Sequence, residues 1–147
     1  MKTIAVGYDG AEASKRALAR AADLAEALKA KLVVVSVAEL MPLAADASYP
    51  GDAMGIATAG MPPVPDEAEA RRELHEAQAA LAKRDIEVEY ASTVGDPADG
   101  IVEEAEERDA DLIVVGTRHP GFLDRLLGGD VGEAVSRRSQ RDVLIVH

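Results

Sequence analysis

Residues 111–118 read DLIVVGTR, and this stretch is the clearest indication of the fold. Its centre is a short, continuous apolar run rich in β-branched side chains, which is typical of a strand covered on both faces. The run ends at Gly116 and passes into a polar turn. Residues 3–10 (TIAVGYDG) repeat the form, with an apolar run that ends at Asp9-Gly10. Two such segments at opposite ends of the chain favour parallel strands of one buried sheet.

Three more segments are predicted strands, and helical patterns lie between all five. The other strands are 32–37 (LVVVSV), 86–91 (IEVEYA) and 143–146 (VLIV), of which 86–91 alternates and suits a sheet edge. Helices are expected over 12–30, 66–84 and 96–108, with a last one starting near residue 130. This alternation predicts a single-domain, five-stranded, doubly wound parallel sheet in the flavodoxin-like order 3-2-1-4-5, with four helices.

Local signals position two of the helices. In 12–30 an apolar stripe is expected from Leu18, Ala21, Ala25 and Leu28. Asp96-Pro97 predicts a helix start, because aspartate caps free N–H groups and proline suits the first helical position.

The last helix and one long loop complete the pattern. Asp130 begins the last helix, where it would form an aspartate version of the capping box with Glu133. Val131, Ala134 and Val135 are expected to face inward. Residues 40–65 contain prolines and glycines without a usable period. A loop of that length is usually a lid, a binding loop or a disordered excursion.

Composition excludes several functions. The 147-residue chain has 27 Asp and Glu against 16 Lys and Arg, so its formal net charge is −11. Such a chain repels nucleic acid and anionic membranes. It has no cysteine, which excludes disulfides and thiol chemistry. The apolar run near the N-terminus is too short for a signal segment or a membrane span, so a cytoplasmic protein is expected.

A ligand site is expected where the strand order reverses. In an open α/β sheet, ligands sit beyond the carboxyl ends of the strands at that point. Here it lies between the strands at 3–8 and 111–115, so the turns that start with Asp9 and Gly116 should converge on one crevice. No Walker loop, G-x-G-x-x-G or G-x-S-x-G is present, so these known phosphate loops and the nucleophile elbow are excluded.

Metal and flavin sites are disfavoured. His75, His119 and His147 do not have metal-ligand spacing, so no metal site is predicted. Electron transfer on a flavodoxin-like fold is a further alternative. Aromatic residues make up only 3% of the chain, with no tryptophan to stack on a flavin.

Three segments together resemble the universal stress protein (UspA-like) family. They are IAVGYDGAEASKRAL near the N-terminus, DLIVVGTR, and LLGGDVGEAV followed by DVLIV at the end. The resemblance covers essentially the whole chain in order. It implies a five-stranded α/β fold, cytoplasmic stress-associated roles, and homodimers formed partly through the last strand, here 142–147. One branch of the family binds ATP through G-x2-G-x9-G-[ST], and another lacks that motif.

The phosphate part of the motif is only half present. Gly116 matches the first glycine and Gly129 the third, but His119 stands at the second glycine and Asp130 at the [ST] position. The carboxylate of Asp130 would repel phosphate and itself accept from the N–H groups of the helix start. Arg118 could partly neutralise an anion, and a cation such as Mg²⁺ on Asp130 could bridge to phosphate.

The adenosine part matches better. By resemblance, Asp9 matches the acidic residue that contacts the adenosine end of the nucleotide. Val37 matches the residue whose backbone holds adenine, and Val131 follows the phosphate loop. From the residues alone, Asp9 is equally consistent with a turn residue that caps the first helix.

Two hypotheses follow. The first is a non-enzymatic, stress-associated binding or regulatory module in which ATP binding is weak or absent. The second is an ATP- or AMP-binding switch or slow ATPase that works through Asp9, Val37, Gly116, Arg118, Gly129 and Asp130.

Overall fold

The main sheet has the predicted parallel topology. The computed structural model describes residues 1–41, 64–117 and 130–147. The strands of the main sheet are β1 (Thr3–Gly7), β2 (Lys31–Ala38), β5 (Val88–Val94), β6 (Leu112–Gly116) and β7 (Asp142–Val146). Their order is β5-β2-β1-β6-β7, and every pairing is parallel. Counted along the chain this is the order 3-2-1-4-5, so the predicted single-domain fold is confirmed.

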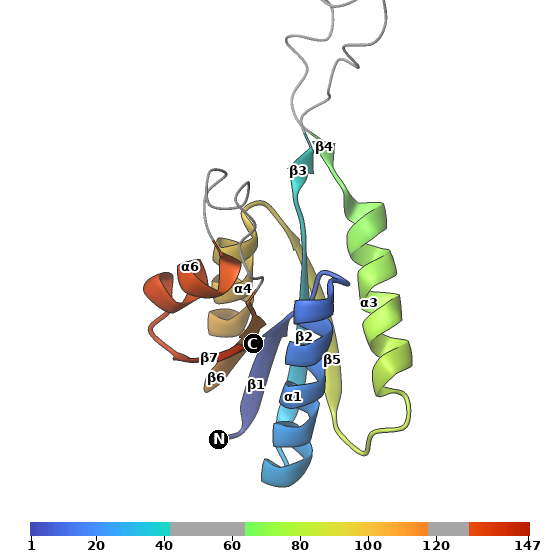
Figure 1. Ribbon diagram of the computed structural model, residues 1–147, viewed down its shortest axis with the longest axis vertical. Coiled ribbons are helices and arrows are strands. Elements are labelled where there is room, and N and C mark those ends of the chain that lie inside the picture. Colours follow the sequence, from blue (N-terminus) through green and yellow to red (C-terminus); the bar gives the residue numbers. More distant parts are fainter. Residues whose placement is uncertain (42–63, 118–129) are drawn as a thin grey trace, which may run out of the picture.

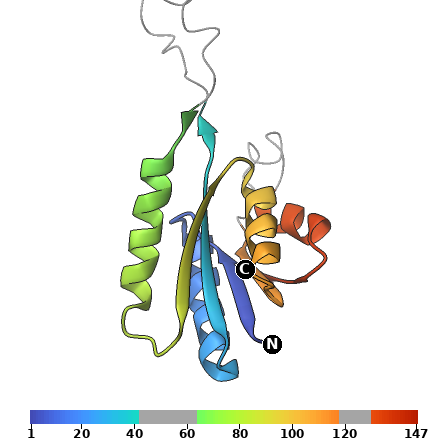
Figure 2. The same cartoon turned by 180° about the vertical axis from the view of Figure 1, so that it is seen from behind.

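Four helices of the described segments cover the sheet, two on each face (Figures 1 and 2). They are α1 (Glu12–Leu28), α3 (Glu67–Leu81), α4 (Pro97–Glu107) and α6 (Val131–Arg138). α1 and α3 pack on one face, and α4 and α6 on the other. This arrangement buries both faces of the central strands, as their continuous apolar sequences require.

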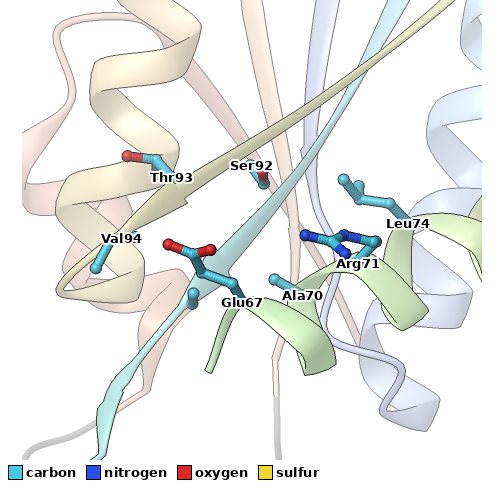
Figure 3. A pocket seen from close by; sticks show the side chains of 8 residues that line it. Glu67, Ala70, Arg71, Leu74, Ser92, Thr93 and Val94 are labelled. Atoms are coloured by element: carbon cyan, nitrogen blue, oxygen red, sulfur yellow. The ribbon is translucent and has the colours of Figure 1, made fainter. Parts of the chain in front are cut away.

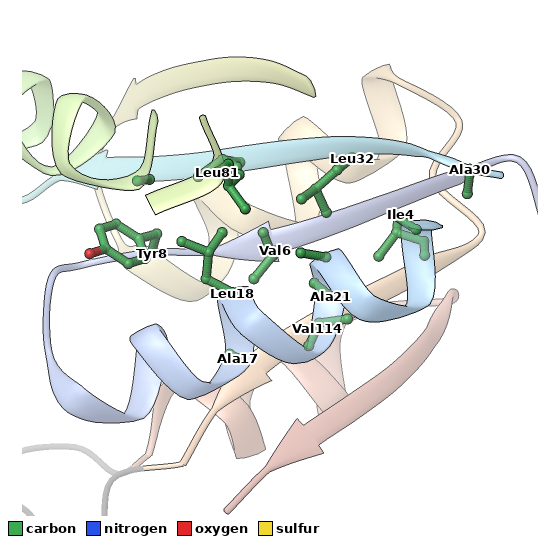
Figure 4. Packing of buried hydrophobic residues seen from close by; sticks show 14 of the residues in the cluster. Ile4, Val6, Tyr8, Ala17, Leu18, Ala21, Ala30, Leu32, Leu81 and Val114 are labelled. Atoms are coloured by element: carbon green, nitrogen blue, oxygen red, sulfur yellow. The ribbon is translucent and has the colours of Figure 1, made fainter. Parts of the chain in front are cut away.

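Alternate residues of the central strands point into two hydrophobic cores, one on each face of the sheet. Ile4, Val6 and Val34 contact the alanine-rich side of α1 and the end of α3 (Figure 4). Ala5 and Val35 face α4 and α6 on the opposite side. Small side chains on α1 let its axis approach the sheet closely, which brings its first turn beside the end of β6.

The start of α4 is formed as predicted and is tied to α6. The side chain of Asp96 accepts a 3.0 Å hydrogen bond from the N–H of Asp99, with Pro97 at the first helical position. Arg138, the last residue of α6, donates to Asp96 at 2.6 Å and to Asp99 at 2.8 Å. The two helices on this face are thereby joined at the level of the α4 N-terminus.

The structure corrects some predicted boundaries. β5 is an edge strand, as predicted, but it begins at Val88 and continues to Val94, because it follows β2 in register as far as Ala38. Leu28 is 47% exposed, because it is the last residue of α1 and is followed directly by the left-handed C-cap.

The long loop 40–65 is not irregular throughout. Its two ends pair as antiparallel strands, β3 (Leu40–Met41) and β4 (Val64–Pro65). The part between them, 42–63, lies outside the described residues.

Candidate functional site

The predicted crevice lies where β1 and β6 end side by side. The two strands pair in parallel from Ile4 opposite Leu112 to Val6 opposite Val114. Asp9 follows the end of β1, and Gly116 is the last residue of β6. The structure therefore brings these two predicted site residues to the same edge of the sheet, at the point where the strand order reverses.

Asp9 organises the turn from β1 into α1. Its carboxylate accepts a 3.0 Å hydrogen bond from the N–H of Ala11, and its own N–H donates to Ser14 Oγ at 3.3 Å. Gly10 between them has a positive φ of 74°, which glycine adopts without strain. Ala11 supplies no side-chain cap to α1. The carboxylate thus closes the turn, and it lies at the adenosine end of the expected site.

Gly116 has a packing role that is independent of any ligand. A Cβ at this position would lie 2.3 Å from the backbone oxygen of Ala13 in the first turn of α1. Only glycine lets the helix backbone approach β6 so closely. The next residue, Thr117, donates its N–H to Val146 O at 2.9 Å, which extends the β6–β7 ladder by one bond.

Asp130 caps α6 and is held by the end of β6. One carboxylate oxygen accepts from the N–H of Gly132 at 3.1 Å, and the other accepts from Thr117 Oγ1 at 2.7 Å. The cap is as predicted. The reciprocal half of a capping box is not formed, because the Glu133 carboxylate lies 3.5 Å from Arg137 instead. The helix start that would meet a phosphate already carries a carboxylate.

Val37 presents its backbone to the crevice. The carbonyl of Val35 accepts from Tyr8 N on the β1 side, and the carbonyl of Ala38 accepts from Gly95 N on the β5 side, at 2.9 and 3.0 Å. Backbone groups alternate in direction along a strand. The N–H and C=O of Val37 therefore point toward the β1 side, beyond the last residue of β1. The family resemblance implies that this backbone holds adenine, and that contact stays a prediction.

Two carboxylates of α3, those of Glu73 and Glu76, lie near Tyr8 next to this edge. Tyr8 is buried, and burial raises its pKa to about 12, with the charge and hydrogen bond of Glu76 and the charges of Asp9 and Glu73 adding to the effect. Glu76 also lies 3.1 Å from Lys15 Nζ. Together with Asp9, these carboxylates make the end of β1 acidic among the described residues.

A cavity of about 280 Å³ lies at a different place, between α3 and the ends of β2 and β5 (Figure 3). Ser92, Thr93 and Val94 line it from β5, while Glu67 and Arg71 line it from α3. None of the predicted nucleotide residues that the structure describes lines this cavity. It is therefore distinct from the crevice at the strand-order reversal.

Neither a metal-binding cluster nor a membrane-spanning helix is found in the described parts of the chain. Within 1–41, 64–117 and 130–147, no group of three or more His, Asp or Glu side chains could hold a metal ion. No helix among these residues is long and apolar enough to cross a membrane.

Of the remaining predicted site residues, the structure describes Val131 alone. Val131 was expected to face inward but is 37% exposed, because Gly132 and Val135 take the buried side of α6. Arg118, His119 and Gly129 lie outside the described residues.

Sequence reasoning missed three polar residues of the neighbourhood. They are Thr117, Ser36 and Glu73. Thr117 directly follows the first motif glycine, but nothing in its position indicated that it would bond Asp130 rather than a ligand. Ser36 interrupts an otherwise apolar strand, and that interruption was the available signal.

Comparisons with known proteins agree with this arrangement. The model of the universal stress protein family matches residues 1–147. The chain is 34% identical to the stress response protein NhaX of Bacillus subtilis, over 97% of this chain and 96% of that protein. It is 36% identical to the universal stress protein Rv1636 of Mycobacterium tuberculosis, over 99% and 96%. A crystal structure of a universal stress protein in complex with cAMP superposes with a TM-score of 0.70 at 35% identity, covering 99% of this chain and 97% of that one. The chain therefore belongs to the universal stress protein family.

Proposed function

We propose that this protein is a non-enzymatic, stress-associated regulatory module that binds adenine nucleotides and selects against the triphosphate. The observation that carries the proposal is the Asp130 carboxylate at the start of α6, held by Thr117 Oγ1 and the N–H of Gly132. An anion already accepts hydrogen bonds at the helix start where a phosphate would bind.

Charge decides which nucleotide is favoured. Two unit charges about 4 Å apart repel by roughly 1–4 kcal/mol, depending on the local dielectric. A cyclic monophosphate carries a single negative charge, AMP carries more, and ATP carries the most. The net charge of the chain, −11, adds to the discrimination. A similar protein has been solved in complex with cAMP, which agrees with a preference for a nucleotide of low charge.

The adenosine end supplies the attraction in this proposal. The backbone groups of Val37 are directed beyond the end of β1 and suit the edge of a purine base. The carboxylate of Asp9 accepts hydrogen bonds and suits hydroxyl or amino donors of the nucleoside. Affinity would thus come from the nucleoside, and selectivity from Asp130.

Isothermal titration with cAMP, AMP and ATP, each with and without Mg²⁺, tests this proposal. We expect affinity to fall in that order, by at least about tenfold from cAMP to ATP, which corresponds to about 1.4 kcal/mol. Asp130→Asn keeps the size of the side chain and removes its charge, so it should reduce the difference in affinity between cAMP and ATP. ATP binding as tight as that of cAMP in the wild type would overturn the selectivity.

The second candidate function is an ATP- or AMP-binding switch or slow ATPase. It is favoured by the same placement of Asp9 and Val37, and it requires Mg²⁺ on Asp130 to bridge to phosphate. A stabilisation of several degrees by millimolar ATP with Mg²⁺, together with slow phosphate release, would establish it in place of the first.

We also infer that two copies form a homodimer through residues 142–147. β7 is an edge strand of the described sheet, and its apolar side chains from Val143 to Val146 are only partly buried. An apolar edge of this kind is covered in stable proteins. The cytoplasmic location stays a prediction.

A further inference from the structure

A partly buried polar contact lies beneath α3 at the carboxyl edge of the sheet. Ser36 of β2 is fully buried, and its hydroxyl donates a hydrogen bond to the Glu73 carboxylate on α3. Ser36 lies two residues after Val34, so it faces the same α1 and α3 side of the sheet. The side chain of Tyr8, which is 3% exposed, belongs to this same core. A carboxylate thus meets a buried hydroxyl at the end of an apolar core.

Glu73 has no cation to balance it within the described residues. The ammonium of Lys15, on the neighbouring helix α1, lies 3.1 Å from Glu76 and 3.6 Å from Glu12. None of the ion pairs formed within 1–41, 64–117 and 130–147 includes Glu73. A half-buried carboxylate without a cationic partner is costly to keep ionised.

The negative charges around Glu73 also favour its protonated form. Burial raises the pKa of Glu73 above its usual value, the Ser36 hydroxyl opposes this by bonding the ionised form, and the charges of Asp9, Glu69 and Asp66 raise it further. The groups that face Glu73 thus come from the β1–α1 turn, from β2 and from the start of α3. Ser36, which holds the Glu73 carboxylate, directly precedes Val37 in β2, so Glu73 lies beside the strand end that borders the crevice.

We propose that Glu73 couples proton uptake to nucleotide binding, so that the crevice binds an anionic nucleotide more tightly when Glu73 is neutral. The proposal rests on the proposed nucleotide function and names its regulation. A neutral Glu73 removes one negative charge from beside the end of β2, which makes the electrostatic potential that a nucleotide anion meets in the crevice less negative. By linkage, a bound nucleotide anion favours the protonated form of Glu73 to the same extent.

The test is titration of the intact protein with cAMP from about pH 8 to about pH 5, a range above the ordinary carboxyl pKa. We expect the wild type to bind at least about fivefold more tightly at the acid end, the low end of typical coupling between sites. Glu73→Gln keeps a group that accepts from Ser36 but cannot ionise. The Glu73→Gln variant should bind cAMP at neutral pH as tightly as the wild type does at the acid end of the range. Its affinity should depend little on pH.

Matched controls separate Glu73 from other polar side chains of α3. Glu67→Gln removes an equal charge from an exposed side chain at the start of α3, and His75→Asn removes the imidazole two residues from Glu73. Both should keep the wild-type pH profile. Ser36→Ala removes the hydrogen bond that favours the ionised form, so the midpoint of the profile should move to higher pH. A purely structural role of Glu73 would not produce that shift.

The outcomes distinguish this proposal from the proposed function. A pH dependence of cAMP binding that is unchanged in Glu73→Gln overturns the coupling and leaves nucleotide binding standing. Absence of cAMP binding by the wild type at every pH overturns both. A flattened profile in Glu73→Gln, together with the upward midpoint shift in Ser36→Ala, supports the coupling.

Discussion

Thr117 donates a 2.7 Å hydrogen bond from Oγ1 to the carboxylate of Asp130, across a gap of thirteen residues in the chain. The contact ties the end of β6 to the start of α6. It also directs the second carboxylate oxygen to the N–H of Gly132. A residue type that would repel phosphate is therefore held in place by both of the elements that border the expected phosphate position.

Removing the obstacles to phosphate should restore ATP binding. In Asp130→Ser combined with His119→Gly, serine keeps a helix cap without the charge, and glycine matches the family motif. We expect ATP affinity to rise at least about tenfold, since removing one close like charge is worth about 1–4 kcal/mol. Calorimetric titration with ATP and Mg²⁺ measures the change. Glu133→Gln, which removes a charge from the same helix turn, is the control, and an equal rise in it would refute the special role of Asp130.

Gly116 should not tolerate any side chain. In Gly116→Ala the added carbon would meet the backbone of Ala13 at 2.3 Å, so α1 or β6 must shift. We expect a loss of about 1–3 kcal/mol in the free energy of unfolding, the usual cost of overpacking. Urea unfolding monitored by circular dichroism measures it. In Gly132→Ala the nearest atom lies at 3.4 Å, so that variant should be close to the wild type. Similar losses in both variants would argue against the close approach as the cause.

Stability without ligand should depend on the ionisation of Glu73. Its pKa in the folded state is raised above the ordinary value of 4.5 by burial first, so in the window above 4.5 the folded state holds more protons than the unfolded state. The free energy of unfolding therefore falls as pH rises through the folded pKa. The free energy of unfolding of Glu73→Gln, measured relative to the wild type, should therefore increase with pH across this window and then remain constant. Urea unfolding at a series of pH values measures the difference, and parallel curves for the two proteins would contradict it.

The outer edge of β7 should be sensitive to proline. Val146 O accepts from Thr117 N, so Val146 faces β6, and alternation directs the N–H of Val143 outward. Val143→Pro removes that outward donor while it spares the β6–β7 hydrogen bonds, so the homodimer should dissociate. Light scattering after gel filtration measures the mass, and circular dichroism verifies the fold. Val143→Ala trims the side chain but keeps the donor, and it should stay dimeric. A dimer that persists in the proline variant would exclude this edge as the interface.

Most of the fold could be predicted because its signals are local. Apolar runs such as 111–115 indicate strands buried on both faces, and Asp96-Pro97 marks a helix start through residues that act on their own neighbours. The predictions from sequence were wrong where contacts with another element determine the bounds of a strand or the buried side of a helix. β5 begins and ends where its register with β2 requires, and Val131 is exposed because Gly132 faces the sheet in its place.

The sequence by itself determined the family, the topology and the two departures from the phosphate motif, because each depends on residue type at a given spacing. Only the tertiary structure decided what those residues contact. It placed Thr117 beside Asp130, Ala13 against Gly116, and Glu73 on the hydroxyl of Ser36. These pairs join segments that lie far apart along the chain. No local pattern encodes them, because they follow from how the helices settle on the sheet once its strand order is set.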